Sequence, residues 1–314
     1  MKNSRMALPV LLLLVSCMKG QVTFVTKKHQ IDVFLGGDFV TAYRFDPAYT
    51  KPVLFPLKTP SGLILTRGFP FEELEGESRD HPHHAGLFFT YDRVNNEGFW
   101  NNTDIPPQIS HEEMLSTGAG TLKTSAHWKG KNGNAILREE RTVTFRRDRD
   151  AFILDFNIRL VALERTVFAD TKEGMFAIRV APWLREDRNT GFYLSSAGDS
   201  SAQSIWGTRA SWVKLEGESG NGRGGIVIFN HPESVNYPTY WHARAYGLFS
   251  ANPLGQFVFE KTRGNPSKKG PVPFNLTLEN GEEAIFKFRV LLYDGSRNTE
   301  EIISIFEAYT AVNR

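Results

Sequence analysis

Residues 142–161 have the sequence TVTFRRDRDAFILDFNIRLV, in which apolar side chains recur at every second position on both sides of a charged turn. Threonine, aspartate, asparagine and arginine fill most of the intervening positions. A period of two residues is that of a β-strand with one buried face. The segment therefore predicts two strands, over residues 135–145 and 151–161.

Similar runs extend in both directions from these two strands. Asn132 and Gly133 supply a hairpin signal just before the first of them. The 27 glycines, 16 prolines and 24 phenylalanines suit a chain of many short strands and tight turns. We predict an all-β fold, a large antiparallel two-sheet β-sandwich, with further strands over residues 22–25, 31–35, 39–45, 87–91, 120–128, 175–180, 211–215, 225–229, 247–251, 256–260, 274–278 and 284–292.

Only the C-terminus has a helical pattern. Ile302, Ile305, Phe306 and Tyr309 are spaced at i, i+3, i+4 and i+7. The preceding residues 298–301, Asn-Thr-Glu-Glu, supply an N-cap with acidic residues in the first turn. We expect one amphipathic helix that lies on the sheets.

The N-terminus has the pattern of an export signal. Lys2 and Arg5 precede the apolar run 6–15, which is short for a bilayer span. Residues 14–17, Leu-Val-Ser-Cys, resemble a bacterial lipobox, and Cys17 is the single cysteine of the chain. The alternative is an ordinary signal peptide with a chance cysteine.

This pattern predicts a lipoprotein signal over residues 1–17 and one β-sandwich domain over residues 21–314. The protein is then exported and lipid-anchored at the bacterial cell envelope, on the periplasmic face or at the outer membrane.

Charge and motifs exclude several classes of protein. The formal net charge is +2 with both signs interspersed, so no nucleic-acid partner is expected, and contact with the membrane is expected through the lipid alone. The chain has no HExxH motif, Walker loop, GxSxG elbow or GxGxxG opening a helix. These absences argue against a zincin protease, an NTPase, a dehydrogenase and an α/β-hydrolase, and no nucleotide cofactor is expected.

The chemically densest segment is residues 79–86, Arg-Asp-His-Pro-His-His-Ala-Gly, with three of the eight histidines. On an extended segment, His81 and His83 share one face and His84 points the other way. Paired imidazoles bind a metal or share proton transfer. The alternative is a polar loop whose histidines bond to backbone carbonyls.

A second dense segment covers residues 229–244. His231 follows an apolar run and is expected at a strand end, where functional loops are common. Tyr240, Trp241 and His242 place aromatic faces beside an imidazole, which suits a sugar ring and its hydroxyls. The alternative is that Tyr240 and Trp241 are core or edge aromatics.

Glu173, just before the predicted strand 175–180, is a third candidate, as a general base or a metal ligand. Trp100 and Asn101 are weaker candidates of the same kind.

Several motifs together resemble a known family. They are KPVLFPL at residues 51–57, TPSG at 59–62, DHPHHAG at 80–86, Phe-Trp at 99–100, and the stretch from Asn-His-Pro at 230–232 to Gly-Leu-Phe at 247–249. This string resembles the bacterial family labelled "methane oxygenase PmoA", which is otherwise of unknown function. The similarity spans most of the chain after the signal.

The resemblance implies exported or lipid-anchored proteins of carbohydrate-degrading bacteria, with a galactose-mutarotase-like supersandwich fold. In that class a histidine pair and a carboxylate supply acid and base around the ring carbons of a sugar. The positions that match the motifs are Asp80, His81, His83, His84, Trp100, His231, Trp241 and His242. A methane monooxygenase is not expected, because no run of about 20 apolar residues follows residue 17.

The sequence therefore predicts an enzyme that acts on a carbohydrate or keto-sugar by histidine acid–base or metal-assisted chemistry, as a lyase, hydrolase or epimerase. The alternative is a non-catalytic glycan-binding lipoprotein. The predicted catalytic residues are His81, His83, His231, His242 and Glu173. His81 or His83 would be the base, with His231 and His242 as the facing acid.

The predicted substrate-binding residues are Arg79, Asp80, His84, Trp100, Asn101, Tyr240, Trp241 and Arg244. A divalent metal on His81, His83, His231 and His242 is left open.

Overall fold

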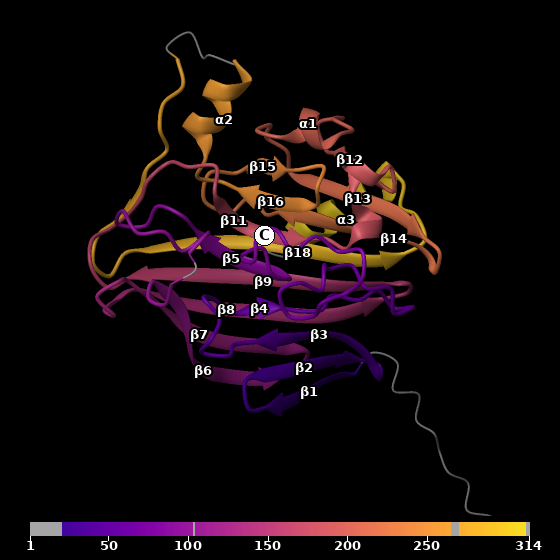
Figure 1. The fold of residues 1–314 in the computed structure, drawn as a ribbon, viewed down its shortest axis with the longest axis horizontal. Coiled ribbons are helices and arrows are strands. Elements are labelled where there is room, and N and C mark those ends of the chain that lie inside the picture. The colour runs from indigo at the N-terminus through magenta and orange to yellow at the C-terminus, as the bar shows by residue number, and fades with distance from the viewer. Residues whose placement is uncertain (1–20, 103, 265–269, 312–314) are drawn as a thin grey trace, which may run out of the picture.

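The computed structural model describes residues 21–102, 104–264 and 270–311 (Figure 1). Two eight-stranded antiparallel sheets dominate it. The first has the order β1-β2-β3-β4-β5-β11-β16-β15 and the second the order β12-β13-β14-β18-β9-β8-β7-β6.

The strands of the first sheet are β1 (Val22–Lys27), β2 (Gln30–Leu35), β3 (Asp38–Arg44), β4 (Val53–Leu54), β5 (Leu87–Tyr91), β11 (Gly174–Arg179), β16 (Leu248–Asn252) and β15 (Tyr240–Ala243). Those of the second sheet are β12 (Gly191–Ser195), β13 (Trp212–Ser219), β14 (Gly222–Asn230), β18 (Glu283–Asp294), β9 (Ala151–Ala162), β8 (Ala135–Asp148), β7 (Thr121–Lys129) and β6 (Gln108–Gly118). A short pair, β10 (Thr166–Phe168) and β17 (Leu276–Leu278), stands apart.

The main core lies between the two sheets because alternate residues of their strands point inward. In β9, Phe152, Leu154 and Phe156 belong to this core. The intervening Ile153 belongs to a separate cluster on the outer face. The predicted all-β two-sheet sandwich is confirmed.

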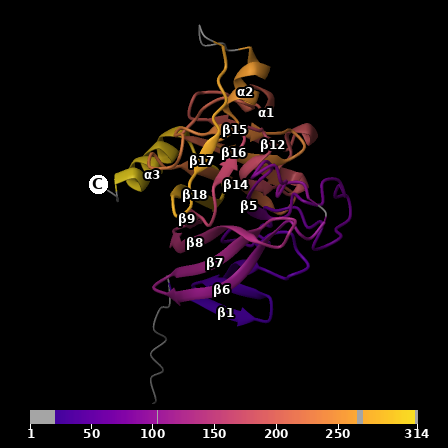
Figure 2. The ribbon, with the colours of Figure 1, turned by 90° about the vertical axis from the view of Figure 1, so that its left-hand side faces the viewer.

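The predicted C-terminal helix is confirmed as α3 (Thr299–Ala311). Ile302 and Tyr309 are buried in the outer cluster of the second sheet, with Ile305 and Phe306 packed against it. Asn298 and Glu301 form reciprocal side-chain to backbone bonds of 2.9 Å at its start. Figure 2 shows α3 and the loops that follow β4 on opposite sides of the molecule.

The prediction that only the C-terminus is helical is wrong. Residues 256–260 were expected as a strand, but they form α2 (Gln256–Arg263). The Asp170 carboxylate accepts the backbone N–H of Phe257 at 2.8 Å and that of Val258 at 3.3 Å. A carboxylate at a helix start offsets the unpaired N–H groups there, and one supplied from 87 residues away is invisible in the local sequence.

Smaller helical turns are α1 (Ala202–Ile205) and the 3-10 turns η1 (Pro182–Leu184) and η2 (Glu186–Arg188). No helix among the described residues is long and apolar enough to cross a membrane. The predicted signal and Cys17 lie outside the described residues.

Candidate functional site

The histidine-rich loop lies on the outer face of the first sheet and leads directly into β5. Gly86 makes this entry possible, because its φ is +61° and a Cβ there would lie 2.5 Å from the Leu54 carbonyl oxygen. The loop can therefore run close over β4 before its chain joins the sheet.

Beneath the loop, small side chains leave a hollow on the outer face of the sheet. Phe88 pairs with Ala177, Ala177 with Ser250, and Ser250 with His242, in one row across β5, β11, β16 and β15. The two small side chains in the middle leave space between the large ones at either end.

A cavity of about 300 Å³ opens in this region. We call it the histidine cavity. It is lined by His81, His83, His84, Trp100, Asn101, Lys172, Glu173, His242, Arg244 and Tyr246. The loop supplies one wall, and residues next to β11 and β15 supply the other.

Asp80 anchors the loop to two buried arginines. Its Oδ1 lies 2.8 Å from Arg67 Nη1 and 2.8 Å from Arg179 Nη2. Burial alone would raise the pKa of Asp80, but hydrogen bonds from Ser78 and His81 and the charge of Arg179 hold that pKa well below its usual range. The carboxylate is therefore ionised at neutral pH.

Arg67 also fixes the backbone of the loop. Its guanidinium donates to the carbonyl oxygens of Asp80 at 2.8 Å, His81 at 3.0 Å and His84 at 3.0 Å. Arg67 is 2% exposed. The loop is thus held by a charged group inside the protein and not by its own local pattern.

His81 is oriented by Asp80. Its Nδ1 lies 2.6 Å from Asp80 Oδ2, so Nδ1 donates to the carboxylate, and in the neutral tautomer with this bond Nε2 carries the lone pair. The ring stacks between those of His84 at 4.9 Å and Tyr246 at 5.4 Å. Its φ is +45°, a strained value for a residue with a side chain. An imidazole held in this way is suited to accept a proton.

His83 and His84 are neutral at physiological pH. Burial first, and then the nearby positive charge of Lys51, lowers the pKa of His83 to about 3. Burial and the neighbouring His83 also lower the pKa of His84. His84 Nε2 is buried without a partner within the described residues, which marks this wall as polar and incompletely satisfied.

His242 faces them with both ring nitrogens occupied. Nδ1 donates to the Lys172 carbonyl oxygen at 2.9 Å, and Nε2 accepts from Arg244 Nε at 3.1 Å. Burial, followed by the charge of Arg244, lowers the pKa of His242 to about 3. The predicted acid role of His242 does not fit a neutral ring without a free nitrogen, so His242 positions Arg244 and Lys172.

Glu173 and Lys172 form an ion pair on the same wall. The Arg179 guanidinium lies over the Tyr246 ring, with its Cζ 4.5 Å from the ring centroid. Burial raises the pKa of Tyr246, so its phenol stays protonated. The cavity is therefore lined by a carboxylate-held imidazole, the Lys172–Glu173 ion pair, the Arg244 guanidinium and the Tyr246 phenol.

A family model described as a family of unknown function, DUF6807, matches residues 30–307. The chain belongs to this family. The match does not name the PmoA-labelled family, so that resemblance stays a prediction.

Several solved structures resemble this DUF6807 chain. One is a galactose mutarotase related enzyme from Lactobacillus acidophilus, with 9% identity and a TM-score of 0.38 over 88% of this chain and 99% of the other. Another is a galactose mutarotase-like protein from Lactobacillus casei, with 7% identity and a TM-score of 0.38 over 87% and 100%. A third is a GH36 α-galactosidase from Geobacillus stearothermophilus, with 10% identity and a TM-score of 0.43 over 87% and 41%.

A similarity at this level does not carry function from one protein to another. No curated protein sequence matches the DUF6807 chain.

Two of the predicted residues lie away from the histidine cavity because they belong to other faces. His231 follows β14 in the second sheet, and its ring packs against Tyr309 of α3 at 4.8 Å. Trp241 points into the main core, where its Nε1 donates to the Ala210 carbonyl oxygen at 2.9 Å. Alternation along β15 sends Trp241 inward and His242 outward, so the two cannot share one site.

Two other predicted residues are also elsewhere. The Tyr240 hydroxyl lies 2.6 Å from Glu260 Oε1 of α2. Arg79 is exposed and pairs with Glu73 at 2.8 Å. Trp100 does line the cavity, but it is only 1% exposed and packs on Phe88 at 5.2 Å, so it supports the wall and offers no open platform.

No group of three or more His, Cys, Asp or Glu side chains in the described part of the chain is arranged to hold a metal. The ring centroids of His81 and His83 lie 5.6 Å apart. The prediction of a divalent metal stays a prediction.

Four residues that shape this region are not among the predicted site residues, namely Lys51, Arg67, Lys172 and Tyr246. Isolated Lys, Arg and Tyr residues carry no motif. Lys51 and Arg67 are distinguished by their burial, and Lys172 and Tyr246 by their place in the cavity wall. Both features depend on pairing between distant strands.

Proposed function

We propose that the histidine cavity binds a carbohydrate or keto-sugar and transfers a proton at a carbon next to a carbonyl. The Asp80–His81 pair carries the proposal, since it places an imidazole oriented by a carboxylate in the cavity wall. An imidazole supported by an ionised carboxylate is a general base for this chemistry.

Other groups in the cavity wall can stabilise the negative charge that forms in this reaction. Removal of a proton beside a carbonyl leaves negative charge on the oxygen, and Lys172, Arg244 and the Tyr246 phenol line the same cavity. Positive charges and hydroxyl donors stabilise such an oxyanion. The imidazolium formed at His81 is in turn stabilised by Asp80.

The lining also supports a polyhydroxylated ligand. The cavity is small for a ligand site, at the lower end of ~300–1,000 Å³, and suits one sugar ring better than a chain. His83, Asn101 and Glu173 offer donors and acceptors to hydroxyl groups, and neutral His83 can do both. Epimerase and lyase chemistry both begin with this proton transfer.

The alternative of non-catalytic glycan binding is less favoured. It depends on Trp100 and Trp241 as open aromatic platforms, and these side chains are 1% and 0% exposed. Export and lipid anchoring through Cys17 remain part of the proposal on the sequence pattern alone.

A screen of solvent exchange tests the proposal. The full chain is incubated in D₂O with a panel of aldoses, ketoses and keto-sugars, and deuterium at sugar carbons is followed by proton NMR. We expect incorporation with at least one member, and a loss of at least about 100-fold in rate in His81→Gln with unchanged circular dichroism. Incorporation that is equally fast in His81→Gln would overturn the assignment.

A further inference from the structure

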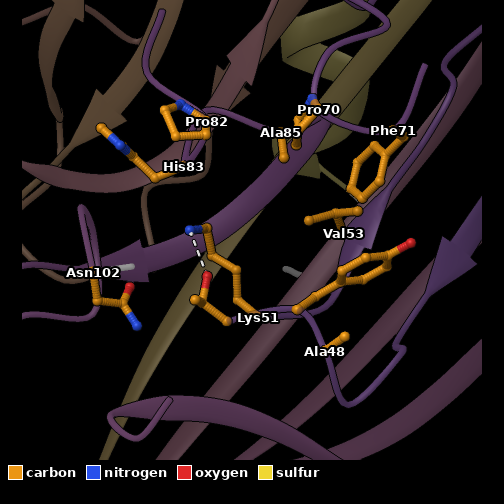
Figure 3. A pocket seen from close by; sticks show the side chains of 11 residues that line it. Ala48, Lys51, Val53, Pro70, Phe71, Pro82, His83, Ala85 and Asn102 are labelled. Carbon is orange, nitrogen blue, oxygen red and sulfur yellow. Dashed lines mark hydrogen bonds between the residues drawn. The ribbon is translucent and has the colours of Figure 1, made fainter. Parts of the chain in front are cut away.

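A second cavity lies on the other side of His83 and does not take part in the proposed function. We call it the lysine cavity, with a volume of about 220 Å³ (Figure 3). Its lining includes Lys51, Val53, Phe71, Pro82, His83 and Ala85. The Lys51 side chain extends toward the space between His83 and Ala85 in Figure 3.

The Lys51 amine is buried with weak polar contacts. Lys51 is 3% exposed. Its Nζ lies 3.4 Å from Thr50 Oγ1, 3.4 Å from the Trp100 carbonyl oxygen and 5.2 Å from the centroid of the Phe88 ring. Both hydrogen bonds are long, so they stabilise an ammonium group poorly.

Burial lowers the pKa of Lys51 to about 7, and no carboxylate among the described residues offsets it. A far larger share of Lys51 than of an exposed lysine is therefore the neutral amine at pH 7. A lysine desolvated in an apolar pocket is an activated nucleophile.

The walls of the lysine cavity are mostly apolar. Phe71 and Val53 stand on one side, and Pro82 and Ala85 continue the surface. Such walls favour a small molecule with an apolar substituent, whereas the amine needs an electrophilic carbon at the other end of that molecule.

We propose that Lys51 is a nucleophilic amine that captures a small aldehyde or ketone as an imine in the lysine cavity. The neutral nitrogen attacks the carbonyl carbon, an N–C bond forms, and the C=O electron pair moves to oxygen. A proton passes from nitrogen to that oxygen, which gives a carbinolamine. After protonation of its hydroxyl group the nitrogen lone pair forms C=N, water leaves, and loss of the N–H proton gives the neutral imine. No oxidant or reductant is needed.

This capture is independent of sugar chemistry in the histidine cavity, because the two cavities share only the His83 wall. The Lys51 experiment therefore fails or succeeds separately from the solvent-exchange screen.

Reductive trapping tests the proposal. The native full chain is treated with butanal and cyanoborohydride, and alkylated lysines are mapped by peptide mass spectrometry. We expect Lys51 to be alkylated at least about tenfold faster than the exposed Lys28 at pH 7, since an ordinary lysine, with a pKa near 10.4, is almost fully protonated there. The Lys51 rate should reach half its maximum near pH 7.

Two variants serve as controls. Lys51→Met should remove the fast alkylation and leave that of Lys28 unchanged. His81→Gln should keep alkylation of Lys51 even if it abolishes solvent exchange. Absence of label on Lys51 in the native wild type, or equal rates at Lys28 and Lys51, would overturn the proposal.

Discussion

The Asp80 carboxylate connects the histidine loop to the sheet through ion pairs. It faces two guanidinium groups, of Arg67 and Arg179, that are buried on their other sides. Asp80→Asn should lower the free energy of unfolding by about 2–3 kcal/mol, less than full burial would imply because the Asp80 side chain is 39% exposed. Urea unfolding measures this difference.

Arg79→Gln is the matched control at the neighbouring position. The Arg79 pair with Glu73 is exposed, so this change should stay within about 0.5 kcal/mol of wild type. An equal effect of the two variants would mean that Asp80 does not anchor the loop.

Burial of Lys51 should make the free energy of unfolding depend on pH. Its pKa falls from 10.5 to about 7 on folding, so between these values the unfolded chain holds a proton that the folded chain has lost. The free energy of unfolding of the wild type should therefore rise with pH across this window. Lys51→Met, which cannot titrate, should be more stable by about 3–4 kcal/mol at pH 6, and the difference should shrink toward pH 10.

Urea unfolding of both proteins between pH 6 and pH 10 measures this effect. Lys28→Met, at an exposed position, should show no such trend. A constant difference for Lys51→Met across the window would contradict burial of the neutral amine.

Residue chemistry in the sequence located part of the site. His81, His83 and His84 are predicted site residues because histidines crowd one loop, and all three line one cavity. His231 is predicted because it follows an apolar run at a strand end, and it lies against Tyr309. The difference depends on which sheet a strand joins, and a strand's own sequence does not encode that choice.

At the scale of elements, α3 is the helix whose signals are local. Asn298 and Glu301 form the reciprocal bonds that begin it. Asn298→Ala should cost about 1 kcal/mol, and Asn298→Asp should retain most of the stability, as both side chains accept the same N–H group. Thermal unfolding of the three proteins, with solvent exchange as the second readout, measures the effect.

Neither change should alter solvent exchange, because α3 covers the second sheet and the histidine cavity lies on the first. A change in exchange rate without a change in stability would contradict this separation.

Elements that depend on residues far away in the sequence were predicted less well. Helix α2 depends on Asp170, and its apolar residues also fit the period of a strand. Trp241 and His242 are neighbours in the sequence and are predicted as one site, although the alternation of β15 places them on opposite faces of the first sheet. Local periodicity identifies an element, and tertiary contacts decide what its faces meet.

At the scale of the molecule, the alternation in residues 142–161 and the similar runs along the chain were sufficient to predict a two-sheet sandwich. It could not predict the strand order, in which β5 pairs with β11 and β11 with β16. That order brings residues as far apart as His81 and His242 to one cavity. The composition of the cavity could be anticipated, but its two-sided arrangement depends on non-local pairing.

The central claim is that this cavity, and no other histidine cluster, performs proton transfer on a sugar. The most direct measurement compares His81→Gln with His231→Gln for the sugar that exchanges fastest with D₂O in the wild type. We expect a fall of at least about 100-fold in kcat for His81→Gln and less than about twofold for His231→Gln, at equal folded fraction. Equal losses in both variants, or no loss in His81→Gln, would contradict the account.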